Sequence, residues 1–582
     1  MQYSGITLKA LSLVLLLALP VWGGEATAGE KAIDFRLIDH RGASHQIHRF
    51  LDKKFIVLTA WQHDCPDTAA ISAAIDELAA LDVAAIAALG VSPSPLAAHD
   101  AVTQKAAALG IHAPILLDEA QLIVPQLGLE YAGDTLLVEA GSWKVLQRGT
   151  AASAEGVQAL RAALESCLKG EGIPVSAAPA GEGACVLDVA PQLQDVSYSK
   201  DIAPILAAHC VACHSPGNGA PFSFSDAKKA QGWAKMTKEV VLTQRMPPWS
   251  ADPHIGVFKN GRGLSPEEQR KLAAWIDAGA VVGAGESDPL SKLELPAPRA
   301  WLLGAPDLVL AFEKPEVIPP EGVQKYRHIF VKSNLTEDKW LRGADVLPGN
   351  AAVVHHVLVF MKYPEDKDWM QYDPVDGMRS FTAGFVQGKE VAFFPEGTGM
   401  FVPAGTEFMF QMHYTATGKE ETDVSELGLY FCKEKPEREL MMRTAFHINF
   451  AIPPHATDYE ISAKHLVKQD SMLYSMTPHM HFRGSRMRYD AHFPDGTSKT
   501  LLSVVNYDFN WQHLYELAEP VFLPQGTKIE CVGAFDNSVR NEFNPNPDDT
   551  VEFGQQSWEE MYIGYIAYAP VAPIKDGPHR RY

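Results

Sequence analysis

The five-residue run Cys210-Val211-Ala212-Cys213-His214 constrains this chain more than any other feature. Two cysteines separated by two residues and followed by histidine form the attachment signal for c-type haem, in which the thiols form thioether links and the histidine is an axial ligand. With 7 Cys and 21 His in 582 residues, chance predicts about 0.003 such runs per chain. Redox or zinc chemistry is the alternative use of a Cys-x-x-Cys pair, but the sequence has no second pair. The run therefore predicts one covalently attached haem c.

The surrounding sequence predicts an α-helical cytochrome c domain over residues 195–283 and resembles the small c-type cytochromes. Ser265-Pro266-Glu267-Glu268 carries the capping signals of a helix in its C-terminal part. A thioether ligand raises the reduction potential of haem, so Met246 is the predicted sixth ligand. Met236 and His254 are the weaker candidates.

Four motifs with histidine or methionine follow in the C-terminal half. They are His355-His356, Gln411-Met412-His413-Tyr414, His479-Met480-His481 and Glu560-Met561. About one His-x-His is expected by chance with 21 His in 582 residues, so ordinary core or surface residues are the alternative for each motif by itself. On a β-strand, however, side chains two apart project from the same face, so His479 and His481 can bind one metal ion.

Together the motifs predict two copper ions. Imidazole binds copper, zinc and iron, whereas a thioether selects Cu(I). The predicted ligands are His355, His356 and His413 for one copper, and His479, His481 and Met561 for the catalytic copper. Adjacent residues on a regular strand face opposite sides, so His355 and His356 can share a metal only where the backbone is irregular.

The order of these motifs resembles the copper type II, ascorbate-dependent monooxygenase family, which includes peptidylglycine and dopamine monooxygenases. The resemblance covers about Ala305 to Pro573. It implies two antiparallel β-sandwich copper domains, which we place at residues 300–438 and 439–582. It also implies that the His-His-His copper passes electrons and the His-His-Met copper binds O2.

Some positions depart from the family pattern. Tyr562 stands where members have a cysteine that pairs with one in the Cys531 region, so the family disulfide is missing. Thr477 and Ile563 stand where the peptide-processing relatives use Arg and Asn to bind a carboxylate, although Tyr565 keeps a matching tyrosine.

The N-terminus reads as a secretory signal peptide over residues 1–28. A single positive charge, Lys9, precedes a short apolar run, and Ala26-Thr27-Ala28 offers a small-residue cleavage site. The run is shorter than the roughly 20 residues of a membrane span, and no later stretch is apolar enough for one. We therefore expect a periplasmic protein without a membrane span.

Residues 29–170 alternate strands and helices, which predicts an α/β domain. The expected elements are a buried strand over 55–61, a helix over 69–81 and a strand over 83–91. Phe35-x-Leu37-x-Asp39-x-x-Gly42 followed by Cys65-Pro66 resembles the thioredoxin-like redoxins. Thr68 replaces the second cysteine of dithiol members, and Tyr131-Ala132-Gly133-Asp134 lacks their active-site proline. The domain is therefore either a structural or docking domain or one in which Cys65 is a low-pKa thiolate.

Two segments rich in Gly, Ala and Pro, near 170–194 and 283–298, are expected to be linkers. Export permits a disulfide between Cys167 and Cys185, although the sequence leaves the pairing of these cysteines, Cys432 and Cys531 open. The net charge of −21 argues against nucleic acid or an anionic membrane as partner.

These observations predict a multidomain periplasmic copper monooxygenase that uses O2 to hydroxylate a C–H bond of a small-molecule substrate. We expect a periplasmic one-electron donor to reduce the haem, and the haem to reduce the copper at His355, His356 and His413. Two alternatives remain: a non-catalytic copper and haem electron-transfer protein, and a peroxidase-like redoxin that depends on reactive Cys65. The substrate, the donor and the oligomeric state are left open by the sequence.

Overall fold

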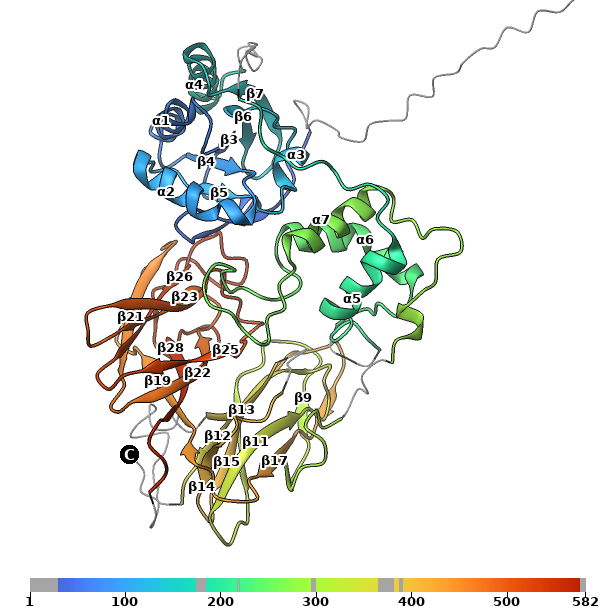
Figure 1. The fold of residues 1–582 in the computed structure, drawn as a ribbon, viewed down its shortest axis with the longest axis vertical. Helices are drawn as coiled ribbons and strands as arrows, with labels where there is room; N and C mark the ends of the chain where they lie inside the picture. Colours follow the sequence, from blue (N-terminus) through green and yellow to red (C-terminus); the bar gives the residue numbers. More distant parts are fainter. Residues whose placement is uncertain are drawn as a thin grey trace, which may run out of the picture.

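The computed structural model describes residues 30–173, 185–216, 218, 220–294, 300–364, 381–386 and 391–575. The predicted signal peptide lies outside these ranges. Figure 1 shows an α/β domain at one end, a β-sandwich at the other, and a second β-sandwich beside a helical segment between them. The C-terminal sandwich therefore contacts both the first domain of the chain and the sandwich that precedes it. No helix in the described part of the chain has the length and apolar character needed to cross a membrane.

The N-terminal domain is a five-stranded sheet flanked by helices. In spatial order its strands are β5 (Ile115–Leu117), β4 (Ile86–Ser92), β3 (Phe55–Ala60), β6 (Asp134–Glu139) and β7 (Val145–Thr150). A separate ribbon pairs β1 (Arg36–Ile38) with β2 (Ser44–Gln46). The helices are α1 (Thr68–Ala79), α2 (His99–Leu109), α3 (Ile123–Gln126) and α4 (Ala154–Leu168). β3 runs parallel to β4 and antiparallel to β6.

The predicted strand, helix and strand of this domain are confirmed, with shifted ends. Every residue of β3 is buried, as a continuous apolar run covered on both faces requires. The second strand begins at Ile86 rather than at Val83, because Asp82 accepts hydrogen bonds from the backbone N–H groups of Ala84 and Ala85 and holds them in a turn.

The helical segment consists of a short π-helix, η3 (Tyr198–Ile202), and α5 (Ala203–His209), α6 (Ala227–Leu242) and α7 (Pro266–Asp277), followed by η4 (Leu290–Lys292). The capping box at Ser265 and Glu268 is present at the start of α7. The expected linker after residue 283 is partly ordered against this segment: Tyr198 donates to Asp288 at 2.9 Å, and Leu290 is buried in the helical core.

Residues 249–260, between α6 and α7, leave the helical core and pack on the second sandwich. Their backbone exchanges hydrogen bonds with its strands, including Asp252 N–H to the Ser503 carbonyl (2.8 Å) and Ala518 N–H to the Val257 carbonyl (2.8 Å). The predicted cytochrome range thus contains a segment that belongs, by its contacts, to the second sandwich.

The first sandwich encloses one apolar core between two sheets. One sheet is β10 (Arg327–Lys332), β15 (Glu407–Tyr414), β12 (Val354–Lys362) and β13 (Phe381–Val386). The other is β18 (Arg438–Glu439), β14 (Thr398–Val402), β11 (Lys339–Leu347), β17 (Glu426–Phe431) and β8 (Leu308–Ala311), with β9 (Glu316–Ile318) and β16 (Glu421–Asp423) paired beside them. All pairs are antiparallel except β14 with β18.

The second sandwich has the same plan. One sheet is β19 (Met441–Phe446), β28 (Ile563–Pro570), β22 (Ser471–His479) and β25 (Tyr515–Leu523). The other is β21 (Tyr459–Leu466), β26 (Lys528–Phe535), β23 (Gly484–His492) and β24 (Ser498–Val504), with β20 (Ala451–Ile452) paired to β27 (Val551–Glu552). The mostly β character of this half agrees with the prediction.

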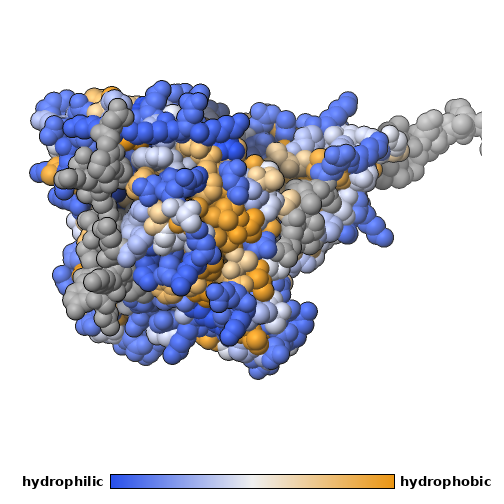
Figure 2. Space-filling view, turned by 90° about the horizontal axis from the view of Figure 1, so that it is seen from below, coloured by the Kyte–Doolittle hydropathy of each residue, from blue (hydrophilic) through white to orange (hydrophobic). Residues whose placement is uncertain are grey.

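The face seen from the end opposite the α/β domain is mostly hydrophilic, with hydrophobic residues gathered near its middle (Figure 2). Exposed apolar side chains of the first sandwich include Val309, Val323 and Phe330.

Candidate metal centre

The structure brings His355, His356 and His413 together, and we call them the trihistidine cluster. His356 on β12 pairs directly with His413 on β15, and one ring nitrogen from each of the three residues lies within 4.8 Å of the others. The pairing register shifts between Val354 and His356. This bulge supplies the irregular backbone that two adjacent histidines need in order to share a site.

The ring nitrogens of this cluster are oriented by neighbours. The His355 Nε2 atom donates to Asn510 Oδ1 at 2.9 Å, and His356 Nε2 lies 3.1 Å from the Tyr326 hydroxyl. The Nδ1 atoms of His355 and His356 are 3.0 Å apart, and the buried Nδ1 of His413 has no hydrogen-bond partner. Partners on one ring nitrogen and an unsatisfied second nitrogen are the pattern of metal-binding histidines.

Burial keeps these imidazoles neutral. It lowers the pKa of His413 to about 3 and, together with the neighbouring His413 and His355, holds the pKa of His356 well below its usual value. The pKa of His355 is lowered as well, again by burial. Neutral imidazole is the form that binds a metal, so the cluster fits a copper ion without competition from protons at neutral pH.

His479 and His481 form a second group, which we call the histidine pair. Their ring centroids are 5.4 Å apart. The expectation that both lie on one strand is wrong: β22 ends at His479, and His481 lies in the connection that follows. That connection is held by buried Glu560, whose carboxylate accepts from the backbone N–H groups of His481 (2.9 Å) and Arg483 (2.6 Å).

In the histidine pair, the Nδ1 atom of each ring is engaged in a hydrogen bond. His479 Nδ1 donates to Gln512 Oε1 at 2.6 Å, and His481 Nδ1 donates to the Glu559 carbonyl at 3.1 Å. Burial lowers the pKa of His479 to about 4 and that of His481 well below its usual value. In these neutral rings, the Nε2 atoms are therefore the nitrogens that could offer a lone pair to a metal.

Met561, the predicted third ligand of this pair, is buried and follows Glu560 directly. It belongs to an apolar cluster with Tyr474, Ile563 and Tyr565. Its backbone is thus tied to the residue that fixes His481, although its side chain also has the apolar surroundings of an ordinary core methionine.

Two aromatic rings separate the two groups. Tyr326 lies 5.0 Å from His413 and 6.0 Å from His481 between ring centroids. Phe509 lies 5.9 Å from His355 and 6.0 Å from His481. The trihistidine cluster and the histidine pair are therefore close neighbours across the contact between the two sandwiches.

A cavity of about 390 Å³ adjoins the histidine pair. His479, Gln512, Thr477 and Tyr565 contribute to its wall. Most of the remaining lining is apolar, and it includes Leu358, Phe381, Phe394, Met442 and Tyr474. The buried Thr477 hydroxyl has no hydrogen-bond partner. The cavity can therefore take a largely apolar molecule and offer it one free polar group.

The predicted haem-binding residues lie at the end of α5. His214 Nδ1 donates to the Phe222 carbonyl at 3.2 Å, which leaves Nε2 as its free donor. Cys210 and Cys213 are both free thiols, and the His214 N–H bonds to the Cys210 carbonyl at 2.9 Å. This arrangement fits covalent haem with His214 as an axial ligand.

The candidates for the sixth ligand are separated by the fold. Met246 lies in the loop after α6 and lines a cavity of about 570 Å³, while Met236 on α6 is 46% exposed. His254 donates from Nδ1 to Asp252 (2.7 Å) and from Nε2 to Glu119 (2.8 Å), so both of its ring nitrogens are engaged. Burial opposes the charge of His254, but these two carboxylates raise its pKa to about 9.

The disulfide between Cys167 and Cys185, which the sequence permitted but left open, does not form. Cys185 forms a disulfide with Cys65, and Cys167 is a free thiol. The reason is the path of the segment after residue 184, which runs antiparallel to residues 130–132: Ala132 N–H donates to the Cys185 carbonyl at 2.8 Å. This part of the expected linker is therefore bound to the N-terminal domain, next to Cys65.

The remaining cysteines, Cys432 and Cys531, are free. Cys531 is buried beneath Gly564 and lies near Tyr562, the residue that stands where the copper monooxygenases have the partner cysteine. Because Cys531 is free, the family disulfide is absent here.

Four supporting residues escaped the sequence analysis: Tyr326, Phe509, Asn510 and Gln512. The sequence analysis named Glu560 as part of a motif, but not its hydrogen bonds to the segment that bears His481. Asn510 and Gln512 lie in one loop of the second sandwich and reach different histidine groups. Residue types so common in loops carry no signal of this role without the tertiary structure.

Residues 28–150 match the model of the AhpC/TSA family, so this part of the chain is a thioredoxin-like redoxin domain. Solved structures similar to part of this chain include peroxidoxin BcpB from Mycobacterium tuberculosis, at 20% identity over 23% of this chain and 96% of that one, with a TM-score of 0.20. A hypothetical protein from Sinorhizobium meliloti 1021 has 21% identity over 28% and 95%, with a TM-score of 0.26. A putative thiol:disulfide interchange protein, DsbE, from Chlorobium tepidum has 17% identity over 25% and 96%, with a TM-score of 0.22.

Proposed function

We propose that the protein is a copper-dependent monooxygenase that inserts one oxygen atom of O2 into a C–H bond of a small, largely apolar substrate. The observation that carries the proposal is the presence of two neighbouring histidine groups, largely buried and neutral, with a cavity that His479 of the histidine pair lines. The order of the sequence motifs points to the same activity.

The trihistidine cluster would hold one copper through its Nδ1 atoms, and His479, His481 and Met561 would hold the other. When bound, copper supplies the one-electron chemistry and the activation of O2. The protein's part is orientation and exclusion of water. Asn510 and Gln512 fix the imidazole rings, while the apolar wall of the cavity shields the substrate from solvent.

The helical segment would hold haem c through Cys210, Cys213 and His214, and haem would supply single electrons. Residues 249–260 support this role because they attach the helical segment to the second sandwich. Trp249 of this segment lies 4.8 Å from Tyr515, between ring centroids, at the foot of the loop that bears Gln512. The attached segment keeps a redox group next to the copper module at high effective concentration.

A non-catalytic electron carrier is the main alternative. Such a protein has no need of a substrate cavity, and a filled site next to the histidine pair would favour it. The cavity lined by His479 and Thr477 favours the enzyme.

Metal analysis with O2 uptake tests the proposal. The fully loaded protein should contain one haem and two copper ions per chain, and O2 uptake should rise with neutral apolar substrates from a panel of small molecules. Zinc in place of copper, a single copper, or uptake that no substrate stimulates would contradict it.

A second activity is favoured by the redoxin domain. Cys65 lies directly before α1, in the position of the reactive cysteine of such domains, and is joined to Cys185. We propose thiol–disulfide exchange at this pair, in which an incoming thiolate attacks one sulfur, forms a mixed disulfide and releases the other as a thiolate. Thiol titration before and after mild reduction should reveal two additional thiols, and a disulfide that resists reduction in the folded protein would assign it a structural role.

A further inference from the structure

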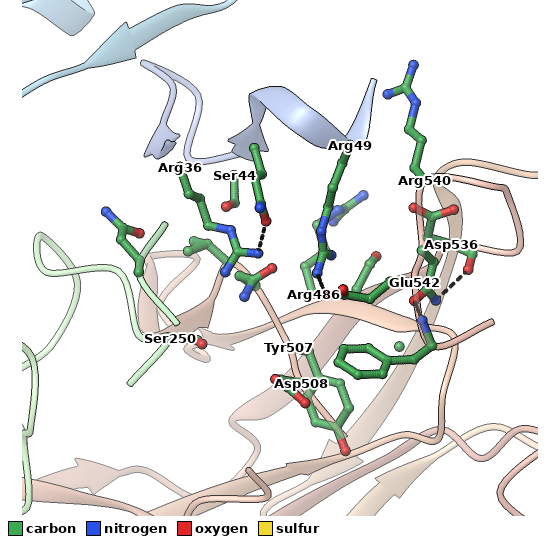
Figure 3. Close-up of a pocket in the computed structure, with 18 of the residues that line it drawn as sticks. Arg36, Ser44, Arg49, Ser250, Arg486, Tyr507, Asp508, Asp536, Arg540 and Glu542 are labelled. Atoms are coloured by element: carbon green, nitrogen blue, oxygen red, sulfur yellow. Dashed lines mark hydrogen bonds and ion pairs between the residues drawn. The ribbon is translucent and has the colours of Figure 1, made fainter. Parts of the chain in front are cut away.

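A cavity of about 580 Å³ lies where the redoxin domain meets the second sandwich and the loop after α6. Figure 3 shows Arg36, Ser44 and Arg49 entering it from the redoxin side, with Tyr507 and Asp508 on the opposite wall. The volume falls in the range of small-molecule sites, and the proposed function makes no use of this cavity.

Arg36 on β1 is the unusual member of the lining. Arg36 is only 3% exposed, and its guanidinium donates a hydrogen bond to the neutral amide oxygen of Gln46. No carboxylate of the described residues lies within ion-pair distance of it. Burial and the like charge of Arg49 lower the pKa of Arg36 to about 9, while the charges of Asp508, Asp34 and Glu542 act in the opposite direction, so the group is still charged at pH 7. A buried cation that has no direct ion pair is costly to the fold.

The other arginines of the lining already have partners. Arg49 pairs with Glu542, Arg245 with Glu239, Arg486 with Asp458 and Glu460, and Arg540 with Asp52. Two carboxylates face the cavity without an arginine in ion-pair distance. Asp508 accepts from the Asn510 side chain at 2.8 Å, and Asp536 accepts from the Ser538 hydroxyl at 2.6 Å.

We propose that this cavity binds a small organic monoanion, a hydroxycarboxylate, with Arg36 as its counter-ion. The guanidinium fork matches a carboxylate in a bidentate manner. One unpaired arginine balances one negative charge, whereas Asp508 and Asp536 repel a second charge and accept hydrogen bonds from ligand hydroxyl groups. This argument favours a hydroxycarboxylate over a phosphate dianion.

The cavity is linked to the trihistidine cluster by two hydrogen bonds. Asn510 donates to Asp508 through its amide and accepts from His355 through its Oδ1. A ligand that contacts Asp508 is therefore connected to His355 through Asp508 and Asn510, and Asn510 orients the His355 ring. The site joins the redoxin domain to the copper module, which gives the redoxin domain a role besides exchange at Cys65.

Calorimetric titration of the full-length protein tests the proposal with lactate, glycerate and gluconate as probes, glycerol as the uncharged match of glycerate, and inorganic phosphate. At least one hydroxycarboxylate should bind, and glycerol should not. Arg36→Gln should weaken the binding by about tenfold or more, because it removes the charge-assisted bidentate contact. Arg245→Gln, which removes an exposed and paired arginine of the same lining, should change the affinity by less than about threefold.

The free proteins provide a second measurement. Without ligand, Arg36→Gln should melt no lower than the wild type, since it removes an unpaired buried charge. A lower melting temperature would identify Arg36 as a structural ion instead. Should the glutamine variant fail to fold, Arg36→Lys keeps the charge but loses the fork and should still bind more weakly than the wild type.

Failure of every hydroxycarboxylate to bind would overturn the assignment. Equal affinity of a hydroxycarboxylate for the wild type and Arg36→Gln would place the anion elsewhere on the protein and would also overturn it. So would tighter binding of phosphate than of every monoanion.

Discussion

The trihistidine cluster and the histidine pair use the same imidazole chemistry in opposite orientations. In the cluster, Nε2 of His355 and His356 meets Asn510 and Tyr326, and Nδ1 points to the shared space. In the pair, Nδ1 meets Gln512 and a backbone carbonyl, and Nε2 is left. Whichever ring nitrogen a neighbour engages in a hydrogen bond, the other is left free, so the residues around the histidines decide which nitrogen each ring could offer to a metal.

The surroundings of the two groups differ as well. The cluster is enclosed by the rings of Tyr326 and Phe509, whereas the pair borders the 390 Å³ cavity. An enclosed site suits electron storage and transfer, and a site beside a cavity suits substrate chemistry. The difference between the groups therefore lies in access and orientation rather than in the kind of side chain.

The largest effect is expected at Met561. Met561→Ala should abolish hydroxylation and weaken Cu(I) binding at the histidine pair only, because no other thioether is assigned to that site. Copper binding to each site and turnover are the measurements. Met472→Ala removes a neighbouring methionine of the same apolar cluster and should retain both activities. Full turnover by the Met561 variant would make Met561 a core residue and would remove this part of the comparison.

Glycine-extended peptides should be poor substrates. Thr477 and Ile563 offer no positive charge to a carboxylate, and Lys259, a lysine of the cavity wall, already pairs with Glu516 at 3.3 Å. Burial of an unpaired charge in the apolar cavity is unfavourable, so we expect kcat/KM at least about a hundredfold below that for a neutral apolar substrate of similar size. Efficient amidation would contradict this view of the cavity. It would require Lys259 to leave Glu516, or Arg483 or Arg486 to leave their present partners, Asn537 and Asp458.

Replacing the two amide side chains that orient the histidine rings should affect the trihistidine cluster and the histidine pair separately. Asn510→Ala should lower copper affinity about 10- to 100-fold at the trihistidine cluster, and Gln512→Ala should do the same at the histidine pair. Each variant serves as the control of the other because both lie in one loop. Equal losses at both sites from either variant would mean that the loop acts as a unit and that the two groups are not independently oriented.

The smallest effect concerns His513, in the same loop but outside both groups. Burial lowers its pKa to about 4. Between about pH 6.5 and 4, this histidine binds a proton in the unfolded chain but stays neutral in the folded chain. Its contribution to the free energy of unfolding is therefore complete above this window and falls by up to about 1.4 kcal/mol per pH unit as the pH drops. His513→Phe should remove this contribution in urea unfolding, with both coppers and turnover retained. An unchanged pH slope would show that His513 is accessible to protons in the fold.

Local sequence patterns predicted features close along the chain. The irregular backbone that His355 and His356 require is present, and the buried strand that begins at Phe55 was predicted because its apolar run is continuous. The end of β22 at His479 was missed, since it is set by Glu560, which is distant in sequence. Cys65 was missed as the disulfide partner of Cys185 because it lies 120 residues away in the sequence, and only the path of the chain past residues 130–132 brings the two together.

By itself the sequence determined which side chains are available and in what order: the Cys-x-x-Cys-His run, the four histidine and methionine motifs, and a redoxin-like start. These are local patterns, fixed by spacing along the chain. The tertiary structure decided which ring nitrogen each histidine presents, which group borders a cavity, and that Arg36 is buried without a direct ion pair beside the second sandwich. Such features depend on contacts between residues hundreds of positions apart, and those contacts form only when separate hydrophobic cores pack against one another.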